Sequence, residues 1–187
     1  SLTSVTIPNG TASIGERAFY NIKTLKTVNL SGCPENFDLP QGLFSGCTAL
    51  ESVILPEGLK SIGNDCFSGM TSLTTVVFPE RVSEEGLTIG DRAFRQTSLT
   101  NVTLPAGVKS LGSSCFALFI EKNHASTDRN DTLTSITWNG PAKDATISRD
   151  AFMRDDGLTA LIIPEGVTTL SSRAFSELQG LKYLKLP

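Results

Sequence analysis

The sequence predicts a right-handed solenoid of the α/β class, with a parallel sheet of short strands and with turns or short helices on the convex side. Three observations predict it. An apolar pattern recurs along the whole chain, a proline follows most of the recurring apolar pairs, and a small residue followed by phenylalanine closes most repeats. One such unit cannot bury its own apolar edge, so successive units must stack.

Each repeat begins at a leucine that lies three residues before an aliphatic residue. The spacings between these leucines are 23, 25, 23, 26, 34, 25 and 23 residues, which gives seven full repeats and a truncated eighth. We therefore expect residues 1–187 to form a single leucine-rich-repeat domain, with an insertion at about 117–132. The starting residues are Leu2, Leu25, Leu50, Leu73, Leu99, Leu133, Leu158 and Leu181.

A short strand is predicted near the start of each repeat. In the repeat from Leu50, Val53 and Leu55 alternate with Ser52 and Ile54, which is the period of two typical of a strand. We expect Val53 and Leu55 to be buried, while Ser52 and Ile54 project outward. A register error of one residue would reverse the two faces.

Proline, usually with a glycine two residues later, ends most of the predicted strands. Proline has no backbone donor and so stops strand pairing, and the glycine two residues later suits a turn with positive φ. An Ile-Gly or Leu-Gly pair then begins the return. The prolines are Pro8, Pro56, Pro79, Pro105 and Pro164, and the glycines are Gly10, Gly58, Gly107 and Gly166.

The phenylalanines that close the repeats are expected to stack as one aromatic column. They are Phe19, Phe67, Phe94, Phe116, Phe152 and Phe175.

Four cysteines are present, and none forms a CxxC pair, so a zinc or redox motif is not supported. Cys66 and Cys115 precede a column phenylalanine where other repeats have alanine, so we interpret them as small buried hydrophobes. Four free thiols are expected. A bridge between Cys33 and Cys47 remains an alternative, since adjacent coils would bring them close.

Two repeats depart from the pattern. The repeat from Leu25 reads Leu30-Ser31-Gly32-Cys33-Pro34 after its strand and reaches Leu39-Pro40-Gln41-Gly42 late. The repeat from Leu133 has Trp138-Asn139-Gly140-Pro141 at the strand exit. We expect both departures to remodel the loop that leaves the strand without breaking the sheet.

The pattern L-x-x-V-x-I-P-x-G-V-x-x-I-G-x-x-A-F resembles the BspA-type leucine-rich repeat, and the resemblance covers almost the whole chain. It implies a solenoid ectodomain of the kind found on surface and secreted proteins of anaerobic bacteria and some protists. It also implies an extracellular or cell-surface location and a role in adhesion to host or matrix proteins. No family catalytic residues exist to transfer.

Charge and hydropathy exclude several classes of partner. The net charge is −3 with no basic run, so we expect no nucleic-acid partner. No stretch approaches the roughly 20 apolar residues of a membrane-spanning helix. No capping repeat is recognisable, so we expect either that the natural protein extends beyond this span or that its ends are frayed. The oligomeric state is left open.

The outward strand residues are the first candidate binding surface. They are rich in serine and threonine, whose hydroxyls suit hydrogen bonding to a protein or glycan. The simpler alternative is that threonine is a good strand residue. The candidate residues are Ser52, Ile54, Thr75, Val77, Asn101, Thr103, Ser135 and Thr137.

The insertion is the second candidate, because insertions in solenoids often lie on the binding face. Leu118, Phe119 and His124 are its candidate contacts. The alternative is a tolerated loop, since lengthening a loop costs little. The spacing of Asp128 and Asn130 resembles the start of a calcium-binding loop. The glycine and the distal glutamate of such a loop are absent, so we expect a solvated polar loop.

Catalysis is not expected. His124 is the single histidine, so any Ser-His-Asp or Cys-His site would have to use it. The adjacent pairs Glu84-Glu85 and Asp155-Asp156 are interpreted as solvated turns. We expect no catalytic residue, no metal and no cofactor.

Two functions remain: an adhesin-like surface or secreted module that binds an extracellular protein or glycan, and a structural spacer arm in a larger surface protein.

Overall fold

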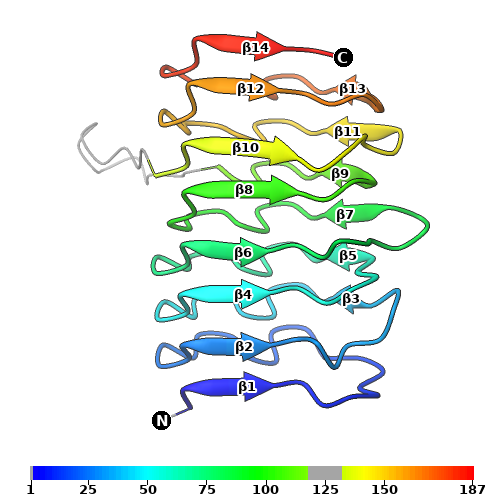
Figure 1. Cartoon of the computed structure of the whole chain (residues 1–187). Helices are drawn as coiled ribbons and strands as arrows, with labels where there is room; N and C mark the ends of the chain where they lie inside the picture. Colours follow the sequence, from blue (N-terminus) through cyan, green and yellow to red (C-terminus); the bar gives the residue numbers. More distant parts are fainter. Residues whose placement is uncertain (1, 118–131) are drawn as a thin grey trace.

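The computed structural model describes residues 2–117 and 132–187, so the predicted contacts Leu118, Phe119 and His124 lie outside the described residues. The chain winds as a stack of parallel coils, with the N-terminus at one end and the C-terminus at the other (Figure 1). The described residues form strands and turns but no helix. The solenoid is confirmed, whereas the α/β class and the short convex helices were wrong.

The first sheet is built from the predicted strands. Neighbouring strands are parallel and in register, so that Val28, Val53 and Val76 stand side by side. The strands are β1 (Ser4–Thr6), β2 (Thr27–Asn29), β4 (Ser52–Ile54), β6 (Thr75–Val77), β8 (Asn101–Leu104), β10 (Ser135–Trp138), β12 (Ala160–Ile162) and β14 (Tyr183–Lys185).

A second sheet, which the sequence analysis did not predict, forms the opposite side of the stack. It is continuous over six parallel strands, in the order β13-β11-β9-β7-β5-β3. Its central strands end at the Ile-Gly or Leu-Gly pairs, where the sequence predicted only that the chain turns back toward the next repeat. The strands are β3 (Asp38–Leu39), β5 (Ser61–Ile62), β7 (Leu87–Ile89), β9 (Val108–Leu111), β11 (Ala145–Ile147) and β13 (Val167–Leu170).

The convex side is a wall of turns, which was one of the two predicted alternatives. In one turn, Asp65 and Gly69 have φ of 55° and 75°, and such left-handed residues end a right-handed helix. The amides of Asp65, Phe67 and Gly69 donate to three carbonyls of the next coil at 2.9, 2.8 and 2.9 Å. The intervening amides of Cys66 and Ser68 donate within the turn at 3.2 and 3.1 Å. Alternating backbone conformations thus direct every second amide toward the next coil.

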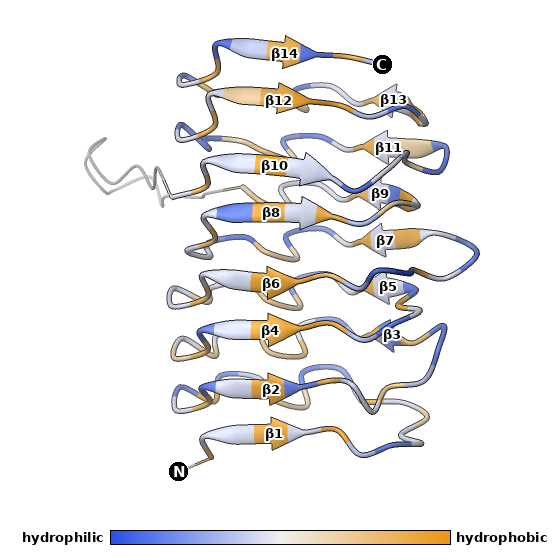
Figure 2. Ribbon diagram, in the orientation of Figure 1, coloured by the Kyte–Doolittle hydropathy of each residue, from blue (hydrophilic) through white to orange (hydrophobic). Residues whose placement is uncertain are grey.

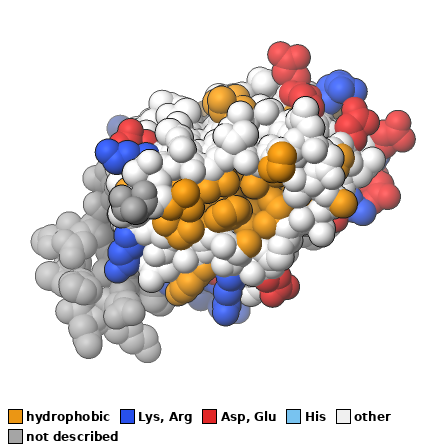
Figure 3. Space-filling model, turned by 90° about the horizontal axis from the view of Figure 1, so that it is seen from below, with side chains coloured by type: hydrophobic (Ala, Val, Ile, Leu, Met, Phe, Trp, Pro, Cys, Tyr) orange, Lys and Arg blue, Asp and Glu red, His pale blue; other side chains and the backbone are white. Residues whose placement is uncertain are grey.

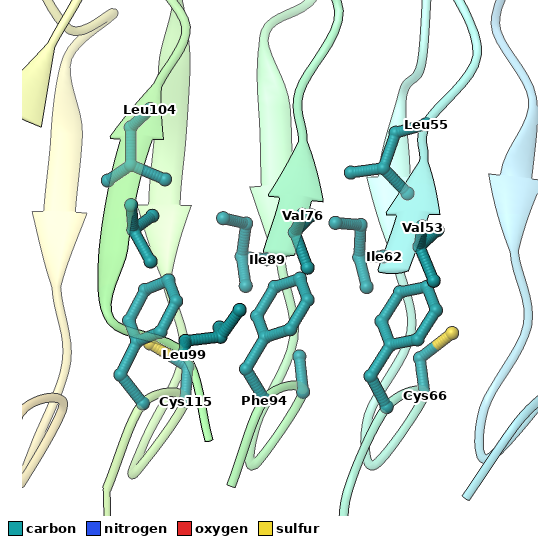
Figure 4. Close-up of a cluster of buried hydrophobic side chains, with 14 of the residues drawn as sticks. Val53, Leu55, Ile62, Cys66, Val76, Ile89, Phe94, Leu99, Leu104 and Cys115 are labelled. Carbon is teal, nitrogen blue, oxygen red and sulfur yellow. The ribbon is translucent and has the colours of Figure 1, made fainter. Parts of the chain in front are cut away.

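The phenylalanine column is confirmed and is longer than predicted. Its rings are nearly parallel, with centroids of neighbours 5.2–6.0 Å apart. Figure 4 shows Phe94 packed in the core near Val76 and Ile89. The additional member is Phe44, which stacks between Phe19 and Phe67.

The late Leu39-Pro40-Gln41-Gly42 motif of the second repeat was misinterpreted. Leu39 pairs with Ile62 in the second sheet, so this segment is not a strand exit. Leu43 then occupies the position that is alanine or cysteine in other repeats, and Phe44 follows it in the column. Both Leu43 and Phe44 are fully buried.

The first sheet is divided into three parts, with no pairing between β6 and β8 or between β10 and β12. An aromatic residue stands at the exit of the strand before each break. Phe78 directly follows β6, and Trp138 is the last residue of β10, paired with Leu104 of β8. The other repeats have leucine or isoleucine there. The larger rings thus coincide with the breaks, and the Phe78 ring packs edge-on against Phe94 of the column, with centroids 6.0 Å apart. The expectation that the Trp138 segment would leave the sheet intact was therefore wrong.

The apolar side of the first repeat is uncovered at the N-terminal end. Figure 3 looks onto this end and shows apolar side chains at its centre, with charged side chains gathered along part of the rim. Leu2 is 47% exposed, and Val5, Ile14, Phe19 and Ile22 are only partly buried against the core.

Candidate binding surface

The outward residues of the first sheet define the candidate surface, which we call the strand face. The predicted register is correct: Val53 is 1% exposed and Ile54 is 61% exposed. Ser52 also projects outward. The face therefore consists of the outward residues of β1, β2, β4, β6, β8, β10, β12 and β14.

The strand face carries an apolar pair. Ile54 and Val77 are paired across β4 and β6, and Val77 is 48% exposed. In Figure 2 both strands remain orange toward their tips, whereas the tip of β2 is blue. Further along the face, Ile162 and Tyr183 are 54% and 53% exposed. Exposed apolar residues next to polar ones are common at protein contacts.

A cluster of polar side chains lies beside the apolar pair, on β8 and β10. The Asn101 amide oxygen accepts a hydrogen bond from the Ser135 hydroxyl at 2.6 Å and another from the Thr134 hydroxyl at 3.2 Å. The hydroxyls of Thr103 and Thr137 are 3.0 Å apart and share a hydrogen bond. The structure therefore brings together four predicted residues, Asn101, Thr103, Ser135 and Thr137. This cluster occupies the two-stranded part between the two sheet breaks.

The strand face is almost uncharged. Every outward residue from β1 to β12 is neutral, and Lys185 of β14 is the one charged member. A neutral surface exerts little long-range attraction, so recognition here depends on shape, hydrogen bonding and apolar contact.

The cysteines form no reactive centre. All four are free and buried, as expected, so the alternative Cys33–Cys47 bridge is not formed. Burial raises the pKa of each thiol, and a thiol held in its protonated form is a poor nucleophile. Among residues 2–117 and 132–187, no three His, Cys, Asp or Glu side chains come together to hold a metal ion.

One acidic pair was misinterpreted. Glu84 and Glu85 are exposed, as expected, but Asp155 is only 3% exposed. Its position three residues after the column phenylalanine is taken by Met70 in another repeat. One Asp155 carboxyl oxygen is buried without a hydrogen-bond partner. Burial, with the nearby charge of Asp156, raises the Asp155 pKa well above its ordinary value.

These features define a parallel repeat solenoid of the leucine-rich-repeat class, with a neutral, outward-facing strand surface. The chain belongs to the BspA-type leucine-rich repeat family, whose model matches it in six copies over residues 1–122, 37–148 and 145–187. None of the curated proteins compared with this chain is similar to it.

Two solved structures share the fold. A leucine-rich cell surface protein from Faecalibacterium prausnitzii A2-165 is 23% identical, with a TM-score of 0.56 over 99% of this chain. A leucine-rich repeat protein from Bacteroides ovatus ATCC 8483 is 25% identical, with a TM-score of 0.64 over the same share. This chain spans 61% and 49% of those two chains. Within the described residues, no helix has the length and apolar character needed to cross a membrane.

Proposed function

We propose that this chain is a non-catalytic, adhesin-like binding module at the cell surface or outside the cell, where it engages an extracellular protein or glycan. The observation that carries the proposal is the strand face, on which the apolar pair Ile54 and Val77 adjoins the neutral cluster of β8 and β10. The F. prausnitzii neighbour is described as a cell surface protein, which supports the location.

Weak contacts repeated along a rigid face add up in a way that one contact cannot. Parallel strands present the outward residues at regular intervals of about 4.8 Å. Hydroxyl and amide groups supply adaptable hydrogen bonds, and exposed aliphatic side chains supply apolar area. A partner that spans several strands would gain affinity from many small contributions. The insertion residues Leu118, Phe119 and His124 remain a proposed second contact.

A screen against extracellular-matrix proteins and a glycan array tests this proposal. The variant Ile54→Asp/Val77→Asp places charge on the strand face at two exposed positions that contribute little to the core. Thr168→Asp, at an exposed position of the second sheet, is the matched control. A partner captured by the parent chain and the control, but lost by the double variant, is the expected result.

Two further outcomes have distinct meanings. A partner that is retained by the double variant but lost when Leu118–Asp131 is deleted would move recognition to the insertion. Failure to capture any partner would favour the spacer function. A continuous stack of rings and of hydrogen bonds between coils supports that alternative, because such a stack resists bending.

A further inference from the structure

A hollow of about 600 Å³ lies on the edge of the solenoid, away from the strand face. It forms where a short loop runs between two longer ones. Residues 30–37 and 78–86 connect the sheets before β3 and β7, whereas only residues 55–60 precede β5. Figure 1 shows the loops before β3 and β7 projecting further from the stack than the loop between them.

The hollow is built from hydrogen-bonded backbone. The Asn36 amide donates to the Gly58 carbonyl and the Gly58 amide donates to the Arg81 carbonyl, both at 2.9 Å. The Ser83 hydroxyl, in a side chain only 6% exposed, donates to the Asn36 amide oxygen at 2.9 Å. Three successive coils are thereby fixed to one another. A ligand that enters would not have to order these loops, which favours binding.

The lining offers hydrogen-bond donors from cationic side chains and acceptors from carboxylates. Arg81 pairs with Glu35, and Lys60 pairs with Glu85, each at 3.4 Å. These side chains are 41–72% exposed, so each ion pair contributes little to stability and its atoms remain open to further hydrogen bonds. Val82 is the one aliphatic side chain among the lining residues.

We propose that this hollow binds a neutral saccharide unit through the Arg81–Glu35 and Lys60–Glu85 pairs. A sugar hydroxyl both donates and accepts, so neighbouring hydroxyls can bridge a carboxylate and its cationic partner without separating them. Glu84 also lines the hollow, so three carboxylates face two cations and an anionic ligand is disfavoured. An apolar ligand would strip water from charged groups without replacing their hydrogen bonds. The inference deepens the proposed function and rests on its glycan alternative.

Nuclear magnetic resonance titration of the labelled chain tests this site. Maltotriose, lactose and chitobiose are added at millimolar concentration, and a sialylated lactose provides the charged comparison. For at least one neutral sugar we expect saturable shifts of the amides of Asn36, Gly58 and Ser83. Arg81→Ala should weaken that binding about tenfold or more, because a charged donor to the ligand is lost.

The matched control is Arg154→Ala, which removes an ion pair to Glu177 at 2.7 Å in the turn wall. It should leave the titration unchanged. No saturable shift with any neutral sugar, a preference for the sialylated sugar, or equal binding by Arg81→Ala would each overturn the inference. Shifts confined to strand-face amides such as Val77 and Thr103 would also overturn it while supporting the strand face, so the two proposals can fail separately.

Discussion

The two sides of this solenoid tolerate variation to very different extents. The second sheet runs unbroken through six strands, with register shifts between β7 and β9 and between β11 and β13, whereas the first sheet is broken twice and carries the most varied outward residues. The difference indicates that the second sheet and the turn wall hold the coils together where the first sheet is interrupted. The first sheet is then free to change in sequence and local geometry, which a binding surface requires.

Close contact between coils constrains the middle of the second sheet. A Cβ atom at Gly112 would lie 2.4 Å from the backbone carbonyl carbon of Gly90, and one at Gly63 would lie 2.6 Å from the Gln41 nitrogen. The corresponding positions of other coils hold Pro40, Ser148 and Ser171, so this close approach is specific to the central coils. At the breaks of the first sheet, Phe78 and Trp138 stand where other repeats have leucine or isoleucine, and the next strand is unpaired.

Truncating a phenylalanine to alanine, once in the ring column and once at a break of the first sheet, should give the largest difference in the free energy of unfolding. Phe94→Ala removes a fully buried ring between Phe67 and Phe116 and should lower the free energy of unfolding by about 3–5 kcal/mol. Phe78→Ala removes a partly buried ring at the first break and should cost about 1–2 kcal/mol. Urea unfolding followed by circular dichroism measures both. Equal losses would contradict the comparison.

Adding one methyl group tests the tight packing of the second sheet. Gly112→Ala forces a clash with backbone and should destabilise the chain by about 3 kcal/mol. Gly10→Ala, at φ of 82° but in open space, should cost only about 1 kcal/mol from backbone strain. Thermal unfolding of the two variants gives the ranking. A smaller loss of stability for Gly112→Ala than for Gly10→Ala would contradict this prediction, because it would mean that the coils move apart easily to admit the methyl group.

Asp155 is a charged residue buried in the core, and its burial should make stability depend on pH. Its pKa is raised in the folded state, so above about pH 4 the folded chain binds more protons than the unfolded chain. Its contribution to stability is therefore full at low pH and is lost as the pH rises toward the folded-state pKa. Asp155→Leu should raise the free energy of unfolding at pH 7 by about 1–2 kcal/mol.

Asp155→Asn serves as the control for the pH effect, because it keeps the shape but cannot titrate. Unfolding measured from pH 4 to pH 8 should show a steeper fall for the parent chain than for this variant. Parallel curves would mean that Asp155 is not responsible.

Closing the breaks should change dynamics more than stability. Phe78→Leu and Trp138→Leu restore the aliphatic residue of the other repeats, and we expect β6 to pair with β8, and β10 with β12. The free energy of unfolding should change by no more than about 1 kcal/mol. Hydrogen exchange at strand amides next to the breaks should slow markedly. Unchanged exchange would show that the rings do not cause the breaks.

The smallest effect is expected within the polar cluster. Thr103→Val removes the hydrogen bond to Thr137 at an exposed cross-strand position, at a cost of about 0.5 kcal/mol or less. Its effect on partner capture should be much larger than its effect on stability. A variant that loses stability but not binding would assign the cluster a structural role.

Strict alternation made the first sheet predictable, because Val53 and Leu55 had to share one face. The second sheet was missed because a strand as short as Ser61–Ile62 is too brief to show a period. Phe44 was overlooked because Leu43 stands where a small residue was expected. Asp155 was placed at the surface because charged neighbours in sequence usually lie there.

The turn wall could not be predicted for a different reason. Several of its left-handed positions are held by residues such as Arg92, Gln96 and Glu177, which have no intrinsic preference for positive φ. Hydrogen bonds to the next coil impose this conformation. The outward residues of the strand face could be enumerated from the sequence, but the cluster around Asn101 required the register between β8 and β10.

The direction of the hydrogen bonds gives the turn wall an electrical polarity of its own. From the first repeat to the sixth, amides such as those of Phe19 and Phe94 point toward the C-terminal end, and the carbonyls that accept them point back. Within this wall, the aligned peptide dipoles direct their negative ends toward the N-terminal end, the reverse of an α-helix. Amides beside the second sheet, such as those of Gly63 and Gly90, donate in the opposite direction and so offset this polarity.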